Sequence, residues 1–370
     1  MLGSCTSLQV VGFKANRIAR VSATALPPAL RWLILTDNDL AEVPTQLGER
    51  PALQKLMLAG NRLHDLPESL MQAHQLELLR LSANRLTRVP PWLTGLPRLS
   101  WLALAGNPLG WSRSDAAPLV EVPWAQLRVH GLLGEGASGH IYQVSDLESA
   151  QPMALKVFKG AMTSDGLPEH ELAACLAAGQ HAALCTPSAV VPDHPQGAAA
   201  LLLPLIPPRI TNRAGPPSLQ SCTRDVYPHH LRISIDAASR VALTIATALA
   251  HLHQRGVMHG DVYAHNILWD PSTGDALLSD FGAATLLPVD QPEVCQALLA
   301  LEVRAFGCLL QELFDHTGID EEAIGSAAFG MSELQAVASA CLQENPAVRP
   351  SMAAVVTELQ ASNQRRKRET

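Results

Sequence analysis

The stretch Met258–Asn266, with the sequence MHGDVYAHN, places an aspartate, Asp261, five residues before an asparagine, Asn266. Fourteen residues beyond that asparagine, the chain reads Asp280-Phe281-Gly282. The Asp261–Asn266 spacing and the Asp280-Phe281-Gly282 sequence are each short enough to arise by chance. Whether they indicate a function therefore depends on the segments around them.

A glycine-rich segment lies well upstream, with glycines at Gly134, Gly136 and Gly139. It follows an apolar–polar alternation over 127–133 that predicts a strand, and an apolar segment over 141–144 predicts a second strand. The dinucleotide-binding fold uses similar glycines but continues into a helix. A strand–turn–strand instead favours a hairpin whose backbone N–H groups lie over phosphates.

The next apolar strand carries one lysine, Lys156, in the sequence ALKVF at 154–158. A buried ammonium without a partner is costly, so this lysine needs a carboxylate nearby. A helix is predicted over 168–178, with Pro168 in its first turn. That helix offers two candidates, Glu169 and Glu171.

Taken in order, these motifs resemble the eukaryotic-type protein kinase family, over roughly Leu127 to Leu359. The resemblance implies an α+β bilobal protein-kinase-like domain. It also implies transfer of the γ-phosphoryl group of ATP, with Mg²⁺, to a protein hydroxyl, and we expect serine or threonine as the acceptor.

The resemblance also assigns roles to individual residues. Asp261 would accept the proton of the substrate hydroxyl, Lys156 would hold the α- and β-phosphates, and Glu171 rather than Glu169 would pair with that lysine. Asn266 and Asp280 would bind Mg²⁺. The nucleotide would be bound by residues of the glycine-rich loop, the lysine strand and the strand after the catalytic loop: Gly134, Gly136, Gly139, Ile141, Ala154, Lys156 and Leu268.

Other family positions are structural. His259 and Phe281 would stack with Cys175 between the lobes. Glu302 stands where an aspartate usually braces the catalytic loop, and Arg349 would pair with Glu293.

Three departures from the family pattern concern the activation segment. Gly260 replaces an arginine that binds a phosphorylated activation loop, and Tyr263 replaces a lysine that contacts the transferred phosphate. We expect His265 to take over that lysine's contact. Only thirteen residues separate Asp280 from Glu293. We therefore expect that activation-loop phosphorylation does not control this chain, and that the N-terminal domain controls activity or substrate choice.

Two alternatives remain open. A pseudokinase scaffold would keep the fold and lose catalysis. The departures at Gly260 and Tyr263 favour this alternative. A small-molecule phosphotransferase of kinase-like fold would fit the short activation segment, which offers a poor platform for a peptide. Retention of Lys156, Asp261 and Asp280 favours an active protein kinase.

The first hundred residues are a repeat. The pattern Leu53-x-x-Leu56-x-Leu58-x-x-Asn61 recurs at steps of 22 or 23 residues, giving five copies. It resembles the leucine-rich-repeat family, which implies an α/β leucine-rich-repeat solenoid with short parallel strands and a ladder of asparagines. The exposed strand positions would form a concave face that binds a protein substrate or partner: Lys55, Met57, Glu77, Leu78, Arg80, Trp101 and Ala103.

The change of periodicity sets the expected domain bounds. We expect leucine-rich repeats over 1–109, a linker over 110–125, a protein kinase domain over 126–362 and a basic tail over 363–370. The chain begins almost directly in a repeat, without a polar cap, so we expect the natural array to extend further toward the N-terminus.

Composition narrows the class of protein. A hydrophobic fraction of 47% indicates a globular chain, and a net charge of −7 argues against a general nucleic-acid binder. The seven cysteines include no CxxC pair, so we expect neither disulfides nor a structural metal. No apolar run reaches the ~18 residues that span a bilayer. We expect a cytoplasmic protein, and the sequence leaves its oligomeric state open.

Overall fold

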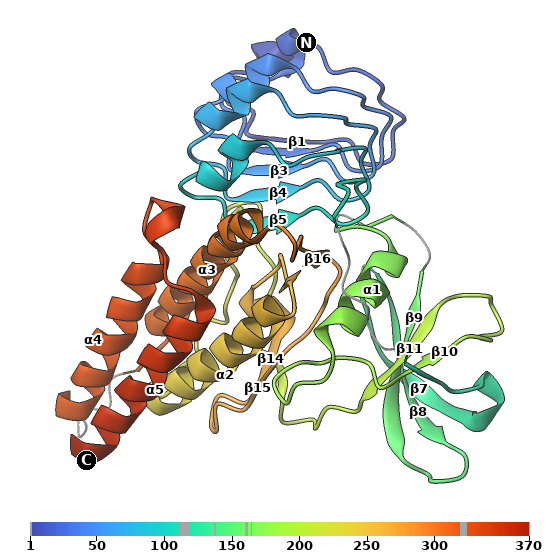
Figure 1. Cartoon of the computed structure of the whole chain (residues 1–370), viewed down its shortest axis with the longest axis vertical. Helices are drawn as coiled ribbons and strands as arrows, with labels where there is room; N and C mark the ends of the chain where they lie inside the picture. Colours follow the sequence, from blue (N-terminus) through green and yellow to red (C-terminus); the bar gives the residue numbers. More distant parts are fainter. Residues whose placement is uncertain are drawn as a thin grey trace.

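The computed structural model describes residues 2–111, 119–136, 138–159, 162–163, 165–318 and 324–369. Two parts are visible in Figure 1, a stack of short strands near the N-terminus and a larger part with a second sheet and several long helices. The expected linker at 110–125 falls partly on residues 112–118, which lie outside the described residues.

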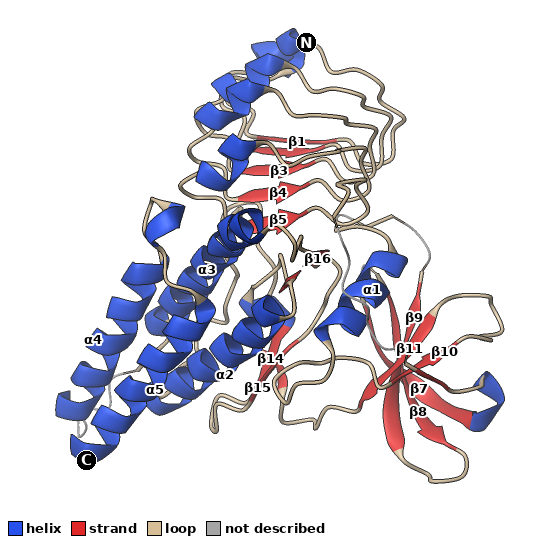
Figure 2. Ribbon diagram, viewed as in Figure 1, coloured by secondary structure: helices blue, strands red, loops and turns tan. Residues whose placement is uncertain are grey.

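The N-terminal part is a parallel sheet of five short strands in sequence order. They are β1 (Val10–Gly12), β2 (Trp32–Ile34), β3 (Lys55–Met57), β4 (Leu78–Arg80) and β5 (Trp101–Ala103). Short 3-10 helices run along the opposite side of the stack: η1 (Leu2–Ser4), η2 (Ala23–Ala25), η3 (Thr45–Glu49), η4 (Glu68–Gln72) and η5 (Pro91–Gly95). Figure 2 shows these two sides clearly.

Leucines and asparagines hold the turns of this stack together. Leu56, Leu79 and Leu102 are fully buried between the strands and the 3-10 helices. Asn61 donates from Nδ2 to the carbonyls of Leu35 and Leu58, both at 2.9 Å, and equivalent bonds recur along the stack. Because each amide ties one turn to the next, the predicted asparagine ladder is confirmed.

A six-stranded sheet with one helix follows. Its strands run in the order β6-β10-β11-β9-β8-β7. Their bounds are β6 (Val120–Glu121), β7 (Leu127–Glu135), β8 (Gly139–Asp146), β9 (Pro152–Phe158), β10 (Ala189–Val191) and β11 (Ala200–Pro204), with η6 (Trp124–Gln126) leading into β7. Helix α1 (Pro168–Ala178) begins at a proline and ends at Gly179, whose φ of 64° suits a residue without a side chain.

The C-terminal part is mainly helical. It contains α2 (Ile235–Gln254), α3 (Pro292–Asp315), α4 (Ile324–Cys341) and α5 (Met352–Glu369). Two small sheets lie against these helices: β12 (Thr211–Asn212), β14 (Ile267–Trp269) and β15 (Ala276–Leu278) form one, and β13 (Val257–Met258) with β16 (Thr285–Leu286) forms the other. The described residues of this part also form the single-turn 3-10 helices η7 (Ala264–Asn266) and η9 (Pro346–Val348).

Two helices of this part bear on expectations from the sequence. Among the described residues, α2 alone is long and apolar enough to cross a membrane, yet over half of it is buried, as expected for a core helix. The basic tail expected over 363–370 is the last part of α5, which runs to Glu369. Arg365 there forms ion pairs with Glu333 of α4 and Glu358 of α5.

The repeat stack sits directly on the C-terminal part. The apolar core of the C-terminal part includes Leu78 and Trp101 from the strands of the stack. The core of the stack in turn includes Met258, Leu298 and Leu301. In Figure 1, β5 lies beside the start of α3 and near β16. The two parts therefore share one continuous apolar interface.

This interface corrects the prediction that the concave face is free for another protein. Lys55, Glu77, Arg80 and Trp101 are all at least nine-tenths buried, and so are Leu78 and Ala103. Glu77 accepts hydrogen bonds from Thr223 and Arg224 of the C-terminal part. Concave positions of the last strands thus bind residues of the same chain: Glu77 binds the segment before α2, and Arg80 and Trp101 bind residues 260–263.

Candidate active site

Lys156 and Glu171 form a buried ion pair between β9 and α1. Lys156 is 8% exposed and Glu171 is 4% exposed. Burial opposes the charge of Lys156, but the attraction of Glu171 outweighs it and raises the pKa of the lysine. Glu169, the alternative partner, is exposed on the same helix. The structure thus brings together the pair expected from the sequence.

A cavity of about 740 Å³ opens beside this pair. This volume is within the ~300–1,000 Å³ range of small-molecule sites. Of the seven residues expected to bind the nucleotide, six line the cavity: Gly136, Gly139, Ile141, Ala154, Lys156 and Leu268. The seventh, Gly134, pairs with Ile141 in the β7–β8 hairpin instead. Leu133, Leu203 and Leu205 also line it, and the sequence analysis did not select them.

The catalytic-loop segment joins Asp261 to Asn266. The amide Nδ2 of Asn266 donates to Oδ2 of Asp261 at 2.8 Å and to its carbonyl at 3.0 Å. That orientation directs the amide oxygen of Asn266 away from Asp261. Asp280 lines the cavity nearby, with its backbone in the left-handed region at a φ of 61°.

The predicted brace by Glu302 is present. The N–H of Gly260 donates to Oε1 of Glu302 at 2.6 Å, and His253 bonds the other carboxylate oxygen at 2.8 Å. Glu302 is buried, which disfavours its charge, yet these bonds lower its pKa. The carboxylate therefore fixes the backbone just before Asp261.

His259 and Phe281 pack between the same elements. Their ring centroids are 5.2 Å apart, and His259 bonds the carbonyl of Ser279 at 3.1 Å. Phe281 and Cys175 are buried and both line the cavity. The expected apolar connection between α1 and the Asp280 loop is therefore in place.

Asn266 and Asp280 each carry an oxygen donor that could bind a cation; Asp280 lines the cavity, whereas Asn266 is buried and is not among the residues that line it. No group of three His, Cys, Asp or Glu side chains that could hold a metal occurs among the described residues. Magnesium is compatible with this donor set, because it commonly binds one or two carboxylates, several waters and the phosphates of a substrate.

Arg80 from β4 reaches this site, and sequence reasoning did not select it as a site residue. Its guanidinium forms an ion pair with Oδ1 of Asp261, and Nη1 donates to the carbonyl of Gly260 at 3.0 Å. Its Nε lies 2.7 Å from Oδ1 of Asp165, in the segment before α1. Burial disfavours a charged Asp261, but Arg80 outweighs that effect and lowers its pKa.

Gly260 and Tyr263, the two family departures, lie against the repeat stack. Gly260 has a φ of 74°, and a Cβ there would lie 2.6 Å from the carbonyl oxygens of Leu102 and Ala283. Tyr263 is buried and stacks on Trp101, whose Nε1 donates to the carbonyl of Val262 at 3.0 Å. Neither position has room for the long cation typical of the family.

His265 is held by Asp225. The N–H of His265 donates to Oδ2 of Asp225 at 2.9 Å, and its Nδ1 lies 2.7 Å from Oδ1. Burial lowers the pKa of this imidazole, but the hydrogen bond and charge of Asp225 raise it overall. An imidazole that Asp225 helps to protonate therefore lies in the same loop as Asp261.

The predicted Arg349–Glu293 pair is wrong. Arg349 donates to the carbonyls of Gln343, Ala300 and Pro97, at 2.8, 2.9 and 2.8 Å. Glu293 is exposed in the first turn of α3. Because α3 begins directly after the short activation segment, the glutamate is carried onto that helix and Arg349 binds the last repeat instead.

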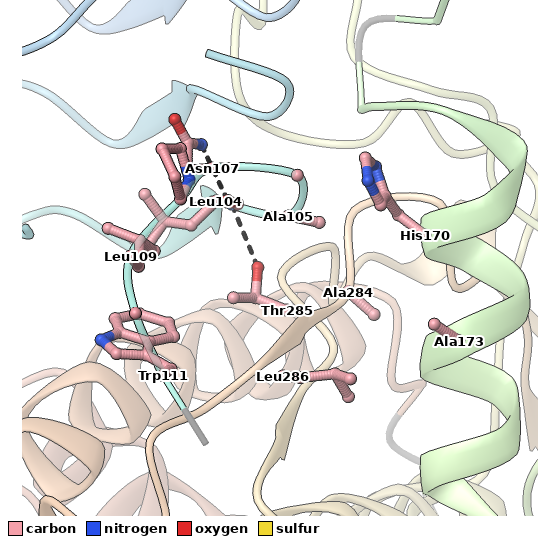
Figure 3. Close-up of a pocket in the computed structure, with 13 residues that line it drawn as sticks. Leu104, Ala105, Asn107, Leu109, Trp111, His170, Ala173, Ala284, Thr285 and Leu286 are labelled. Atoms are coloured by element: carbon pink, nitrogen blue, oxygen red, sulfur yellow. Dashed lines mark hydrogen bonds between the residues drawn. The ribbon is translucent and has the colours of Figure 1, made fainter. Parts of the chain in front are cut away.

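A second, smaller cavity of about 180 Å³ lies where the last repeat meets α1. Figure 3 shows Leu104 and Thr285 on one side and His170 of α1 on the other. The N–H of Leu104 donates to Oγ1 of Thr285 at 3.0 Å. A Cβ on Gly106 would lie 2.2 Å from the ring of His170. The repeat stack therefore also touches the helix that carries Glu171.

Comparison with known proteins agrees with these two parts. Residues 127–305 match the protein kinase domain family, and residues 51–109 match the leucine rich repeat family. The chain therefore carries leucine-rich repeats followed by a protein kinase domain.

Three curated relatives illustrate the range of similarity. Serine/threonine-protein kinase csk1 of Schizosaccharomyces pombe is 30% identical over 32% of this chain and 45% of its own length. Probable serine/threonine-protein kinase PBL26 of Arabidopsis thaliana is 28% identical over 38% of this chain and 47% of its own. Human kinase suppressor of Ras 2 is 23% identical over 46% of this chain and 16% of its own. The chain spans less than half the length of each.

Proposed function

We propose that this chain is an ATP- and Mg²⁺-dependent protein kinase that phosphorylates serine or threonine hydroxyls. The observation that carries this proposal is the formed Lys156–Glu171 ion pair beside a cavity that Asp280 also lines. In protein kinases both the lysine–glutamate pair and the metal-binding aspartate must be in place for transfer. A chain selected only as a scaffold would have no need to retain all three.

The chemistry follows from the side chains present. The acceptor oxygen attacks the γ-phosphorus, the bond to the β-phosphate oxygen breaks, and its electron pair leaves with ADP. Asp261, kept ionised by Arg80, accepts the hydroxyl proton, while Lys156 binds the α- and β-phosphates. Asn266 and Asp280 would hold Mg²⁺, which neutralises charge on the phosphates when it is bound.

Several finer features belong to the same proposal. The repeats form a solenoid over 1–109 and a bilobal kinase domain follows, in a cytoplasmic protein. Because β6 pairs with β10 in the six-stranded sheet, the kinase domain includes Val120 and Glu121, and the linker ends before the expected residue 125. His265, held by Asp225 in the same loop as Asp261, contacts the transferred phosphate in place of the family lysine. The strands β1 and β2 remain as the part of the concave face available to a protein partner, since their positions are less buried than those of β3 to β5.

The test is incubation of the wild type with ATP and Mg²⁺, beside Asp261→Asn and Asp280→Ala. We expect phosphate on the protein itself or on a generic protein acceptor. Asp261→Asn should reduce the rate by about 10²–10⁴-fold, the usual contribution of a general base, with nucleotide binding retained. Glu169→Gln, an exposed change two residues before Glu171 on the same helix, is the matched control. A wild type that binds ATP and transfers nothing would overturn the proposal and favour the scaffold.

The short activation segment favours one further candidate, a small-molecule phosphotransferase. Only Pro288 to Gln291 lie between β16 with its flanking Leu287 and the start of α3, so no helix of the segment offers a platform for a peptide. Transfer to small hydroxyl compounds, without transfer to any protein, would support this candidate.

A further inference from the structure

Arg80 contacts both lobes of the kinase domain at once. One side of its guanidinium bonds Asp261 and the carbonyl of Gly260, in the catalytic loop of the helical lobe. The other side lies 2.7 Å from Asp165, in the segment that leads into α1 of the sheet lobe. The side chain is 3% exposed, so water competes little for these charges. One residue of the repeat domain therefore joins the catalytic aspartate to the segment before Glu171.

The catalytic loop itself is built to admit this arginine. Its backbone at Gly260 approaches the carbonyl of Leu102 so closely that a Cβ would lie only 2.6 Å away. Tyr263 turns its ring onto Trp101, with centroids 4.3 Å apart and planes 8° from parallel. The two positions that carry cations in related kinases are thus used for contact with the repeats. The cation beside Asp261 comes from β4.

The contact belongs to an interface whose two sides share apolar cores. The two parts share apolar cores, with Leu78 and Trp101 in one and Met258, Leu298 and Leu301 in the other. Separating them would expose this surface, which obligate interfaces keep covered. Arg304 and Arg349 add hydrogen bonds to carbonyls of the last repeat, those of Arg98 and Pro97. A reversible inhibitory latch would be expected to have a smaller and more polar contact.

We propose that Arg80 is a positioning residue of the phosphoryl-transfer site, supplied by the repeat domain, which holds Asp261 in place and fixes the segment before α1. This inference rests on the proposed kinase function. In this arrangement repeat docking takes over the task of a phosphorylated activation loop. The active arrangement is then present without a modification, because the arginine is attached through β4 to a rigid stack.

The experiment uses the full-length chain and compares Arg80→Ala and Arg80→Lys with the wild type. The control is Arg88→Ala, which removes an exposed arginine of the same stack paired with Asp65. We expect Arg80→Ala to lower kcat about 10²-fold or more, as loss of one preorganised charge typically does, with little change in the KM for ATP. Arg80→Lys should recover part of kcat, since an ammonium reaches one carboxylate but does not bridge two. Arg88→Ala should match the wild type.

A third variant separates positioning from simple folding. Asp165→Asn removes only one half of the bridge and leaves the charge pair at Asp261. We expect an intermediate loss of kcat and faster hydrogen exchange in residues 165–171, with an unchanged melting temperature. Arg80→Ala with wild-type or higher kcat would overturn the inference, and a higher value would identify the contact as inhibitory.

Hydrogen exchange also keeps this inference separate from the proposed function. A wild type that transfers no phosphate overturns the function. In that case the bridge itself is decided by exchange in residues 165–171 and 259–266, measured in wild type and Arg80→Lys. Faster exchange in both segments of the variant supports the bridge, and unchanged exchange refutes it.

Discussion

Trp101 of the last repeat stacks face to face on Tyr263 of the catalytic loop, with ring centroids 4.3 Å apart and planes 8° from parallel. The indole also donates to the carbonyl of Val262, at 3.0 Å. Both rings are buried, so a large apolar area and a hydrogen bond are combined at one contact. This stack joins the folding of the repeats to the conformation of the active-site loop.

Trp101→Ala should therefore destabilise the whole chain. Truncating a buried tryptophan costs about 3–5 kcal/mol, and here both the repeats and the catalytic loop lose packing. We expect a lower melting temperature and a single transition that shifts for both parts together, measured by circular dichroism and by tryptophan fluorescence. Trp92→Ala is the control, because Trp92 is only partly buried on η5. Two separate transitions in the wild type would contradict the shared core.

The features that could be predicted from the sequence are those set by local motifs. Lys156, Glu171, Asn266 and Asp280 could be placed because each stands at a fixed short distance from a local motif. The asparagine ladder was predictable for the same reason, since a period of 22 or 23 residues determines which backbone groups the amides meet.

Contacts between the two parts could not be predicted in this way. Arg80 and Asp261 are 181 residues apart, and their meeting depends on how two separately patterned domains dock. The concave-face residues were predicted to bind another protein, but those of β4 and β5 are buried against the same chain. The Arg349–Glu293 pair failed because the family pattern was applied across a segment that this chain lacks. The absence of cations at positions 260 and 263 was a usable signal, since a charged Asp261 still needs a partner.

Removing the repeats is therefore a poor way to test their role. A chain from residue 118 onward would expose Met258, Leu298 and Leu301, which are buried against the repeats. Loss of activity in such a truncation would reflect loss of folding. Point variants in the full chain separate the two effects.

Glu302 should be replaceable by aspartate but not by alanine. Glu302→Ala leaves the N–H of Gly260 and the ring of His253 without their buried acceptor, and each unsatisfied group costs about 1–3 kcal/mol. Glu302→Asp keeps a carboxylate one methylene further back. We expect a clear fall in melting temperature and in kcat for alanine and a smaller fall for aspartate. Equal losses in both variants would show that the hydrogen bond from Gly260 to Glu302 is not what supports the loop before Asp261.

The two glutamates of α1 should behave differently. Glu171→Gln removes the charge that Lys156 needs, and hydrogen bonds to charged groups are worth about 1.5–3 kcal/mol. Since ~1.4 kcal/mol is tenfold in rate, we expect kcat/KM for ATP to fall by about 10- to 100-fold. Glu169→Gln should leave kcat/KM for ATP unchanged, because Glu169 is exposed. Steady-state kinetics at varied ATP concentration measure kcat/KM for both variants. Equal losses in Glu171→Gln and Glu169→Gln would contradict the assignment of Glu171 as the partner of Lys156.

His265 should make stability depend on pH near neutrality. Burial alone would lower the pKa of its imidazole, but the hydrogen bond and charge of Asp225, with Asp261 and Asp280, raise it in the folded chain. A raised pKa means that the folded state binds the proton more tightly than the unfolded state, whose histidine has a pKa of about 6.5. The stabilisation is therefore fully present below pH ~6.5 and is lost as pH rises through the folded-state value.

The corresponding measurement is the melting temperature of wild type and His265→Gln over pH 5 to 9, a range of about two units either side of neutrality. We expect the wild type to exceed the variant most at low pH, with the difference shrinking as pH rises. Glutamine can still donate to Asp225, so the pH-dependent part reports the charge and not the hydrogen bond alone. His74→Gln, in the repeats and exposed, should leave the pH profile unchanged. A difference that grows with pH would mean that His265 is buried neutral, because burial would then outweigh Asp225.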